Sequence, residues 1–322
     1  MTEIRNALSL FDGISSGRHA LEKANINFEN YYSSEIDKKS VLVAQKNYPD
    51  TIQLGDVEEW ESWDLEHIDL IMGGSPCQGF AAQGQQYNFD DPRSILFFTM
   101  IDIIKHFKPK YFLLENVRMR KEWEKIITEH MGVEPIHICS SLVSAQRRQR
   151  VYWANWPTSQ PIATHNHLSE ILEKDDGMTN PAFIAGRKIN RNTGKREDDN
   201  IKLPRIQTLE VNKDYSKMCC ITTVEKDSVL TNRSSGRHLD AFTVLKKDID
   251  WRYLTVNEME RLQTLPDDYT QVGNLSDSKR KSMLGNGWTI DVITHLLKQA
   301  VGTEPVITPP RQTSLFNFKT GS

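Results

Sequence analysis

The sequence predicts an α/β fold with a doubly wound, mostly parallel sheet and a second, smaller and irregular domain. Over the first 160 residues, short apolar runs alternate with stretches of helical periodicity, which is typical of such a sheet. From Pro157 to about residue 250 the chain is polar and rich in loop-forming residues, and helical patterns return from Trp251. The length of 322 residues suits about two domains, and an apolar fraction of 38% is enough for a real core.

The expected elements follow in order along the chain. A strand at 7–11 leads through a glycine-containing turn into a helix that ends at Ala24, and a strand at 30–34 leads into a helix at 37–45. Asp91-Pro92 supplies an N-cap and a first-turn proline for a helix with an apolar stripe at Leu96, Phe97, Met100, Ile101, Ile104 and Phe107. The remaining strands are predicted at 51–54, 68–72, 111–114, 137–143 and 150–156, and the remaining helices at 256–264, 277–283 and 289–298.

The charges are unevenly distributed. The net charge is −3, which taken alone argues against a nucleic-acid partner. Residues 1–117 carry a net −8, however, whereas residues 182–250 carry a net +4. This asymmetry suggests that one part of the chain meets a polyanion and another does not.

Several classes of protein are not expected. The four cysteines show no CxxC spacing, so neither a zinc site nor a disulfide scaffold is predicted, and no metal is expected. The longest apolar stretch, near 95–104, contains Asp102 and is too short to span a bilayer. The first residues lack a basic and apolar leader, so we expect a cytoplasmic protein that does not contact a membrane.

The first candidate site is the turn Phe11-Asp12-Gly13-Ile14-Ser15-Ser16-Gly17, where glycine allows close backbone approach to a ligand. The turn lacks the G-x-G-x-x-G spacing of a pyrophosphate cradle. Glu35 ends the next strand and could accept hydrogen bonds from ribose hydroxyls, and Asp56 follows the third strand and could bind an adenine amino group. Together they suggest a nucleoside cofactor without a diphosphate. Separately, each is explained equally well as a turn or a solvated acid.

The second candidate site is the loop Gly73-Gly74-Ser75-Pro76-Cys77-Gln78-Gly79-Phe80, which follows a strand. Open α/β sheets place their sites at the carboxyl ends of strands, so Cys77 is a candidate nucleophile rather than a buried small side chain. Glu115 ends the strand at 111–114 and is expected on the same edge as a candidate acid. Alternation places Arg148 and Arg150 on one face, either as cations that hold a base or phosphate or as a basic surface turn.

The order of these motifs resembles the cytosine-5 DNA methyltransferases, from about residue 7 to residue 297. Gly73–Cys77 and Trp288 look like the vertebrate de novo branch, whereas Gln78 and Gln146-Arg147-Arg148 look like bacterial and phage modification enzymes. The chain follows the family's usual unpermuted order: Phe-x-Gly-x-x-x-Gly from Phe11, Glu35, Asp56, Pro76-Cys77-Gln78, Glu115-Asn116-Val117, Gln146-Arg147-Arg148-x-Arg150, a variable region, Arg252-x-Leu254-Thr255-x-x-Glu258-x-x-Arg261-Leu262-Gln263-x-x-Pro266, and Gly285-Asn286-Gly287-Trp288.

The resemblance implies a fold of the class I S-adenosylmethionine-dependent methyltransferase type and a reaction on cytosine flipped out of double-stranded DNA. Cys77 would add to carbon 6, Glu115 would protonate or hydrogen-bond ring nitrogen 3, and Arg150 would hold the ring carbonyl at position 2. Arg148 would orient Glu115 or bind phosphate. The residues expected around S-adenosyl-L-methionine are Phe11, Asp12, Gly13, Ile14, Gly17, Glu35, Ile36, Asp56, Val57, Leu96, Asn286 and Trp288.

The resemblance also divides the chain. Residues 1–157 and 251–302 would form the catalytic domain, 158–250 the target-recognition domain and 303–322 a flexible tail. Candidate phosphate or guanine contacts in the target region are Arg187, Arg191, Lys195, Arg233 and Arg237. In the tail, Gln312-Thr313-Ser314-Leu315-Phe316 is similar to the pentapeptide that docks bacterial proteins on the replicative sliding clamp, although a Leu-Phe pair can equally pack back on the core. A monomer is expected.

Alternatives to a modification enzyme of bacterial or phage DNA remain open at this stage. A transfer-RNA cytosine-5 methyltransferase would keep the fold, but that branch shows Cys-Phe-Thr where this chain has Cys219-Cys220-Ile221-Thr222. A non-catalytic DNA-binding paralogue typically loses the cysteine or the glutamate, and both are present here. The first glycine turn disfavours a nicotinamide dehydrogenase.

Overall fold

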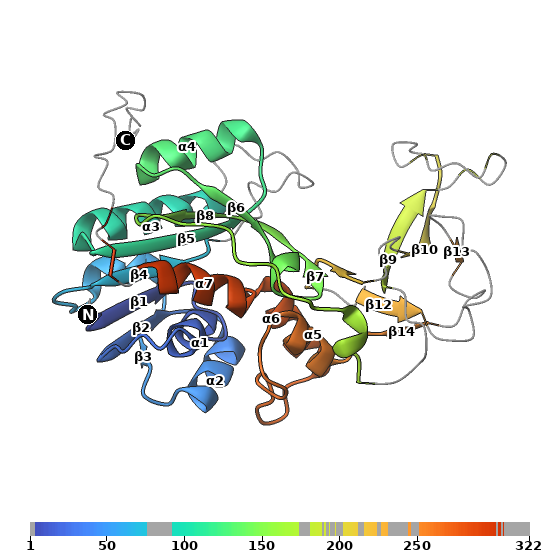
Figure 1. Ribbon diagram of the computed structural model, residues 1–322, viewed down its shortest axis with the longest axis horizontal. Helices are drawn as coiled ribbons and strands as arrows, with labels where there is room; N and C mark the ends of the chain where they lie inside the picture. Colours follow the sequence, from blue (N-terminus) through green and yellow to red (C-terminus); the bar gives the residue numbers. More distant parts are fainter. Residues whose placement is uncertain are drawn as a thin grey trace.

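The computed structural model contains a seven-stranded sheet, whose strands lie between Asn6 and Ala154 (Figure 1). It describes residues 4–75, 92–173, 181–188, 190, 193, 197, 202–211, 216–223, 227–230, 244–245, 251–300, 302–303 and 305. The strand order is β3-β2-β1-β4-β5-β8-β6. The strands are β1 (Asn6–Leu10), β2 (Asn30–Ser34), β3 (Ile52–Gln53), β4 (Leu70–Gly73), β5 (Tyr111–Val117), β6 (Ile136–Cys139) and β8 (Gln149–Ala154).

The sheet is mostly parallel, as the sequence predicts. β1 to β5 pair in parallel, and β8 runs antiparallel to both of its neighbours, β5 and β6. Parallel strands share one carboxyl edge, so the residues that follow β1, β2, β4 and β5 meet there. This edge is where the sequence motifs predict the site.

Helices cover both faces of the sheet, because successive strand residues point to opposite sides. In β1, Ala7 belongs to the apolar cluster that contains α1, α2 and α7, whereas Leu8 belongs to the cluster of α3 and α4. The doubly wound fold class is therefore confirmed (Figure 1). The helices are α1 (Ser16–Lys23), α2 (Lys38–Asn47), α3 (Pro92–Phe107), α4 (Lys121–Met131), α5 (Val256–Leu262), α6 (Asp277–Asn286) and α7 (Ile290–Ala300).

Two local differences from the sequence predictions concern α4 and the strand at 137–143. α4 is absent from the predicted elements, although Trp123, Ile127 and Met131 recur at helical spacing along one face of it. The strand predicted at 137–143 ends at Cys139, where Ser140 N donates to Arg148 O and a short 3-10 turn, Ser140–Leu142, follows. No helix in the described ranges is long and apolar enough to cross a membrane.

The region predicted to be irregular contains a five-stranded antiparallel sheet, with the order β13-β10-β9-β12-β14. Figure 1 shows it at the far end of the molecule from α3. The strands go unrecognised in the sequence because their pairing joins segments separated by polar loops. β14 lies just after residue 250 yet pairs with β12. The strands are β9 (Pro181–Lys188), β10 (Arg205–Val211), β12 (Asp227–Leu230), β13 (Val244–Leu245) and β14 (Trp251–Tyr253).

Candidate active site

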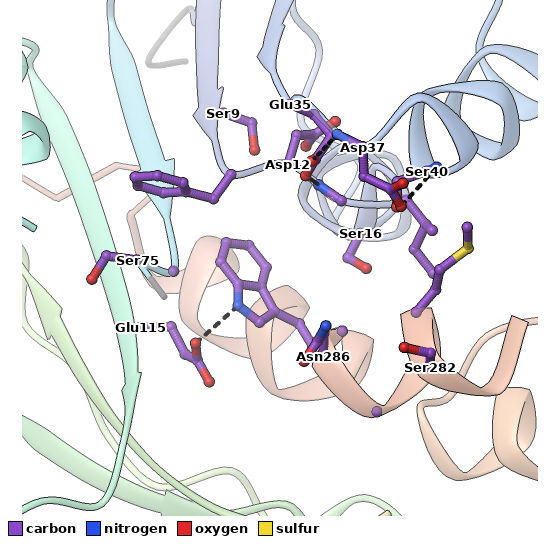
Figure 2. A pocket seen from close by; sticks show the side chains of 18 of the residues that line it. Ser9, Asp12, Ser16, Glu35, Asp37, Ser40, Ser75, Glu115, Ser282 and Asn286 are labelled. Atoms are coloured by element: carbon purple, nitrogen blue, oxygen red, sulfur yellow. Dashed lines mark hydrogen bonds between the residues drawn. The ribbon is translucent and has the colours of Figure 1, made fainter. Parts of the chain in front are cut away.

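A cavity of about 450 Å³ opens at the carboxyl edge of the central sheet. Its walls come from the ends of β1, β2, β4 and β5, and from α6 with the turn that follows it. Figure 2 shows Asp12, Glu35 and Asp37 on one side of it and Glu115 on the other. The sequence-predicted residues among its lining are Phe11, Asp12, Gly13, Ile14, Glu35, Glu115, Arg148, Arg150, Asn286 and Trp288.

Other predicted cofactor residues are described but do not line this cavity. Ile36 is 70% exposed, whereas Val57 and Leu96 pack in or against the α3–α4 apolar cluster. Asp56 caps a 3-10 helix, Val57–Ser62, by accepting from Glu58 N. Gly17 lies in α1, where a Cβ would come within 2.9 Å of Met72 Sδ, so this glycine allows helix and sheet to pack closely. Their cofactor roles remain predictions.

Several predicted residues lie outside the described chain. Cys77 belongs to the undescribed stretch 76–91, and the clamp-like pentapeptide Gln312–Phe316 belongs to the undescribed stretch 306–322. Among the candidate DNA contacts, Arg187 lies in β9, but its side chain is outside the description, as are Arg191, Lys195, Arg233 and Arg237.

The turn after β1 is held open by the carboxylate of Asp12. Its oxygens accept hydrogen bonds from Ser15 Oγ (2.6 Å), Tyr31 OH (2.7 Å) and Ser33 Oγ (2.9 Å). Burial, and then the Asp12 charge, raise the pKa of Tyr31, which therefore remains a donor. Phe11, Gly13 and Ser15 have φ of 56°, 58° and 60°, a left-handed conformation that is costly for non-glycine residues. Asp12 thus stabilises the shape of the turn.

Glu35 forms the second acidic wall. Its two oxygens accept from Gly13 N (2.8 Å) and Asp37 N (2.7 Å). Burial raises the pKa of Glu35, while these two backbone hydrogen bonds act in the opposite direction. The residue therefore presents a fixed carboxylate at the end of β2, with lone pairs left to accept hydroxyl donors.

An ion pair that the sequence motifs did not indicate lies beside Glu35. Lys279 Nζ on α6 is 2.9 Å from Asp37 Oδ2 at the start of α2, and both line the cavity. Burial raises the pKa of Asp37, but hydrogen bonds from Ser40 and Lys279 outweigh it, so this pKa is lowered overall. The pair joins two elements more than 200 residues apart, so no local sequence signal could reveal it.

On the opposite wall, Glu115 is 8% exposed and contacts two donors. Arg150 Nε lies 2.9 Å from Oε1, and Trp288 Nε1 donates to Oε2 at 3.2 Å (Figure 2). Antiparallel pairing of β5 with β8 brings Arg150 opposite Val117, two residues beyond Glu115. Glu115 and Arg150 therefore form an ion pair on the wall of the cavity.

Gly74 lets these groups approach one another. A Cβ on this residue would lie 2.8 Å from Glu115 Oε2 and 3.1 Å from Trp288 Nε1. Under 3.0 Å a neighbouring atom must move. The glycine-rich loop after β4 is thus explained in part by the close approach of backbone, carboxylate and indole.

Arg148 takes a different position from Arg150. Its guanidinium, 2% exposed, donates to Gly285 O (3.1 Å) and Gly287 O (2.8 Å) in the turn that carries Trp288. Burial, and then neighbouring Arg150, lower the pKa of Arg148. Among the described residues, its hydrogen bonds go to backbone carbonyls and to Cys220 Sγ, and not to Glu115.

The residues present fit S-adenosylmethionine, the cofactor that the resemblance implies. Small-molecule cavities are typically about 300–1,000 Å³, and 450 Å³ lies within that range. The acidic wall of Asp12, Glu35 and Asp37 suits a cationic sulfonium and ribose hydroxyls. The described cations of the lining already have partners: Lys279 pairs with Asp37, Arg150 with Glu115, and Arg148 with backbone carbonyls, so they do not form a phosphate cradle. A nucleoside without a diphosphate therefore matches the chemistry of the walls.

Comparisons with known proteins agree with this picture. The profile of the family described as C-5 cytosine-specific DNA methylase matches residues 5–302. The chain is 27% identical over 314 residues to the type II methyltransferase M1.ScrFI of Lactococcus lactis subsp. cremoris, covering 89% of this chain and 75% of that protein. It is 26% identical over 311 residues to M.HaeII of Haemophilus aegyptius, covering 89% of each. The structure of Entamoeba histolytica methyltransferase EhMeth superposes with a TM-score of 0.66 at 19% identity, over 92% of this chain and 98% of that one, which shows a shared fold.

Proposed function

This chain belongs to the C-5 cytosine-specific DNA methylases, and from that membership we propose that Cys77, Glu115 and Arg150 carry its chemistry at the cavity described above. The enzyme transfers a methyl group from S-adenosyl-L-methionine to carbon 5 of cytosine in DNA. Carbon 5 of the free base is a poor nucleophile. The protein therefore has to activate the ring before the transfer takes place.

Cys77 is the proposed nucleophile, with its thiolate adding to carbon 6 so that carbon 5 gains electron density. The described stretch 4–75 ends at Ser75, which lines the cavity and whose Oγ accepts from Asn116 Nδ2 at 3.2 Å. Cys77 follows two residues later in the sequence, and two residues span at most about 7 Å. This short chain connection to the cavity wall supports the proposed role of Cys77. Loss of the proton from carbon 5 after methyl transfer would return the electron pair and expel Cys77.

Glu115 and Arg150 are proposed to hold the activated ring. Glu115 would hydrogen-bond or protonate ring nitrogen 3, which prevents negative charge from building up as the thiolate adds. Arg150, fixed by its 2.9 Å ion pair with Glu115, would hold the ring carbonyl at position 2. Because neither group can reach a base inside a stacked duplex, the cytosine has to be flipped out, at a cost of a few kcal/mol.

The cofactor supplies an electrophilic methyl group on a positive sulfur when it is bound. Around it, we propose that Glu35 accepts from the ribose hydroxyls and that Asp12 holds the turn Phe11–Ser15 in shape. Asn286 and Trp288 would complete the wall towards Glu115. Asp56 remains the candidate for the adenine amino group, although its carboxylate already accepts from Glu58 N.

The ion pair of Glu115 and Arg150, placed on the wall of an acidic nucleoside-sized cavity, carries this proposal. The test measures transfer of labelled methyl from S-adenosylmethionine to unmethylated duplex DNA, with a transfer-RNA transcript as the alternative substrate. Cys77→Ala should abolish transfer and Glu115→Gln should reduce it by about 10²–10⁴-fold. Cys139→Ala, a free cysteine away from the cavity, serves as the matched control and should keep full activity. Wild-type turnover in Cys77→Ala would refute the mechanism.

We propose that residues 158–250, with β14, form the target-recognition region and that the protein modifies bacterial or phage DNA, as a partner of a restriction nuclease or as protection of a phage genome. The net +4 of residues 182–250 supports contact with phosphates. Bisulfite sequencing of DNA from expressing cells would give the recognition sequence, and unmodified cytosines throughout would contradict the proposal. A cytoplasmic monomer is the form we expect to act.

A further proposal rests on sequence alone. Gln312–Phe316, outside the described residues, is proposed to dock on the replicative sliding clamp, because glutamine followed by leucine and phenylalanine suits an apolar pocket. A peptide covering Thr308–Ser322 should bind purified clamp, and Leu315→Ala with Phe316→Ala should abolish binding. Absence of binding by the unsubstituted peptide would end this proposal.

A further inference from the structure

A segment of the proposed target-recognition region is built into the wall of the catalytic domain. β11 (Met218–Cys219) pairs in parallel with β7 (Gln146–Arg147), and the two form a small sheet of their own. Met218 is fully buried, and Ile221 N donates to the buried Gln146 Oε1 at 3.4 Å. Residues 218–222 therefore sit between the five-stranded sheet and the active-site turn.

The backbone of Thr222 and Thr223 packs directly against the backbone of Gly285 in that turn. A Cβ on Gly285 would lie 2.3 Å from Thr222 O and 2.6 Å from Thr223 N. Backbone atoms cannot move aside as a flexible side chain does. The turn Gly285–Trp288 and the segment at Thr222 are consequently in fixed register, and neither can shift without the other.

Arg148 bridges the same two pieces of chain. Besides Gly285 O and Gly287 O, its Nη1 lies 3.3 Å from Cys220 Sγ and 3.5 Å from Ile221 O. One buried guanidinium thus contacts the target-side segment with one nitrogen and the cofactor-side turn with the other. Arginine suits this role because its planar fork offers several donors in fixed geometry.

Contacts continue from this bridge in both directions. Towards the five-stranded sheet, Thr222 donates through N (2.8 Å) and Oγ1 (3.0 Å) to Asp227 Oδ2, and Asp227 begins β12. Towards the catalytic groups, the turn held at Gly287 carries Trp288, whose indole donates to Glu115 Oε2 (Figure 2). A continuous series of polar contacts therefore joins the second sheet to the proposed acid.

We propose that Arg148 is a positioning residue that couples DNA binding at the target-recognition region to cofactor binding at the cavity. This inference rests on the proposed function, in which that region recognises DNA. Each ligand favours one placement of the Cys220–Thr222 segment relative to the Gly285–Trp288 turn, and Arg148 fixes that placement. Coupling of this kind is reciprocal, so each ligand tightens binding of the other by the same factor.

The test measures the Kd of the full chain for a duplex carrying the sequence found by bisulfite sequencing, with and without saturating S-adenosylhomocysteine. For the unsubstituted protein we expect the cofactor product to tighten DNA binding about fivefold or more. Arg148→Lys keeps the positive charge but loses the planar guanidinium. It should bring the ratio of the Kd without S-adenosylhomocysteine to the Kd with it to within about twofold of one. Arg147→Lys, the same substitution at the exposed neighbour, should leave the ratio unchanged. If Arg148→Lys fails to fold, Thr222→Val, which removes the hydroxyl bond to Asp227 at the other end of the same segment, should also lower the ratio.

The outcomes separate this inference from the proposed function. A merely structural role for Arg148 would lower the melting temperature and leave the coupling ratio intact. An unchanged ratio in Arg148→Lys or in its substitute Thr222→Val, or a ratio of one in the unsubstituted protein, overturns the inference even if methyl transfer to DNA proceeds. An unsubstituted protein that transfers no methyl to DNA instead refutes the proposed function, and with it the premise of the coupling.

Discussion

Replacing Gly74 by alanine should impair catalysis while leaving the fold intact. The new Cβ would lie 2.8 Å from Glu115 Oε2, whereas ordinary contacts begin at 3.4 Å, so the carboxylate has to move by about 0.6 Å. Such a shift breaks the 3.2 Å hydrogen bond from Trp288 Nε1 to Glu115. A hydrogen bond to a charged group contributes about 1.5–3 kcal/mol. If that geometry is needed in the transition state, kcat should fall about 10- to 150-fold.

The stability of Gly74→Ala should fall only moderately. Gly74 does not have a left-handed φ, so alanine fits the backbone, and the lower entropy of the unfolded chain favours folding by about 0.4–1 kcal/mol. Loss of the hydrogen bond to Glu115 costs about 1.5–3 kcal/mol, so we expect the melting temperature to fall by a few degrees without loss of the fold.

Single-turnover transfer of labelled methyl and thermal unfolding, measured on the same preparations, test both expectations. Trp288→Phe removes the same hydrogen bond and should lower kcat to a similar extent, and the double variant should be no slower than the slower single variant. Unchanged kcat in Gly74→Ala, or a loss of rate that only follows unfolding, would refute the reasoning.

Three further predictions concern charged groups: Arg150, Glu35 and the basic region 182–250. Arg150→Ala should lower the free energy of unfolding by about 3–5 kcal/mol, because it leaves the buried Glu115 without its ion partner; it should also reduce kcat, and thermal unfolding and single-turnover rates near the wild-type values would contradict these expectations. Burial raises the pKa of Glu35, so on acidification this carboxylate becomes protonated at a higher pH than an ordinary glutamate does. Protonation removes its acceptor charge, and the affinity for S-adenosylhomocysteine, measured by calorimetry, should therefore begin to fall at that higher pH. A Glu35→Gln variant with the same pH dependence would show that another group titrates. Binding of duplex DNA should weaken with salt less steeply than for a strongly basic protein, because residues 182–250 carry a net charge of only +4, and a logarithmic slope near about −10 would show many phosphate contacts.

The central fold and the position of one candidate residue were predictable from local patterns. The strand at 30–34 is observed with those same bounds, and Glu115 lies on the wall of the cavity at the carboxyl edge of the sheet. Two signals explain this: apolar periodicity records which face of each element is buried, and the carboxyl edge of a parallel sheet gathers the residues that follow its strands.

The details of the second region could not be read from the sequence in the same way. β9 and β10 are paired through backbone hydrogen bonds, which hydropathy does not record. α4 was missed for a different reason: Trp123, Ile127 and Met131 form a stripe along one face of it, and the pattern went unrecognised.

The sequence by itself determined the fold class, the family and the residue types that the chemistry requires. The tertiary structure alone decided their partners. Asp37 meets Lys279, Arg148 binds the carbonyls around Gly285 rather than Glu115, and Trp288 reaches Glu115 across 173 residues. The physical reason is that the periodicity of buried residues depends only on neighbouring residues in the sequence. Hydrogen bonds and ion pairs instead depend on distances between atoms that are set only when the separate elements pack together.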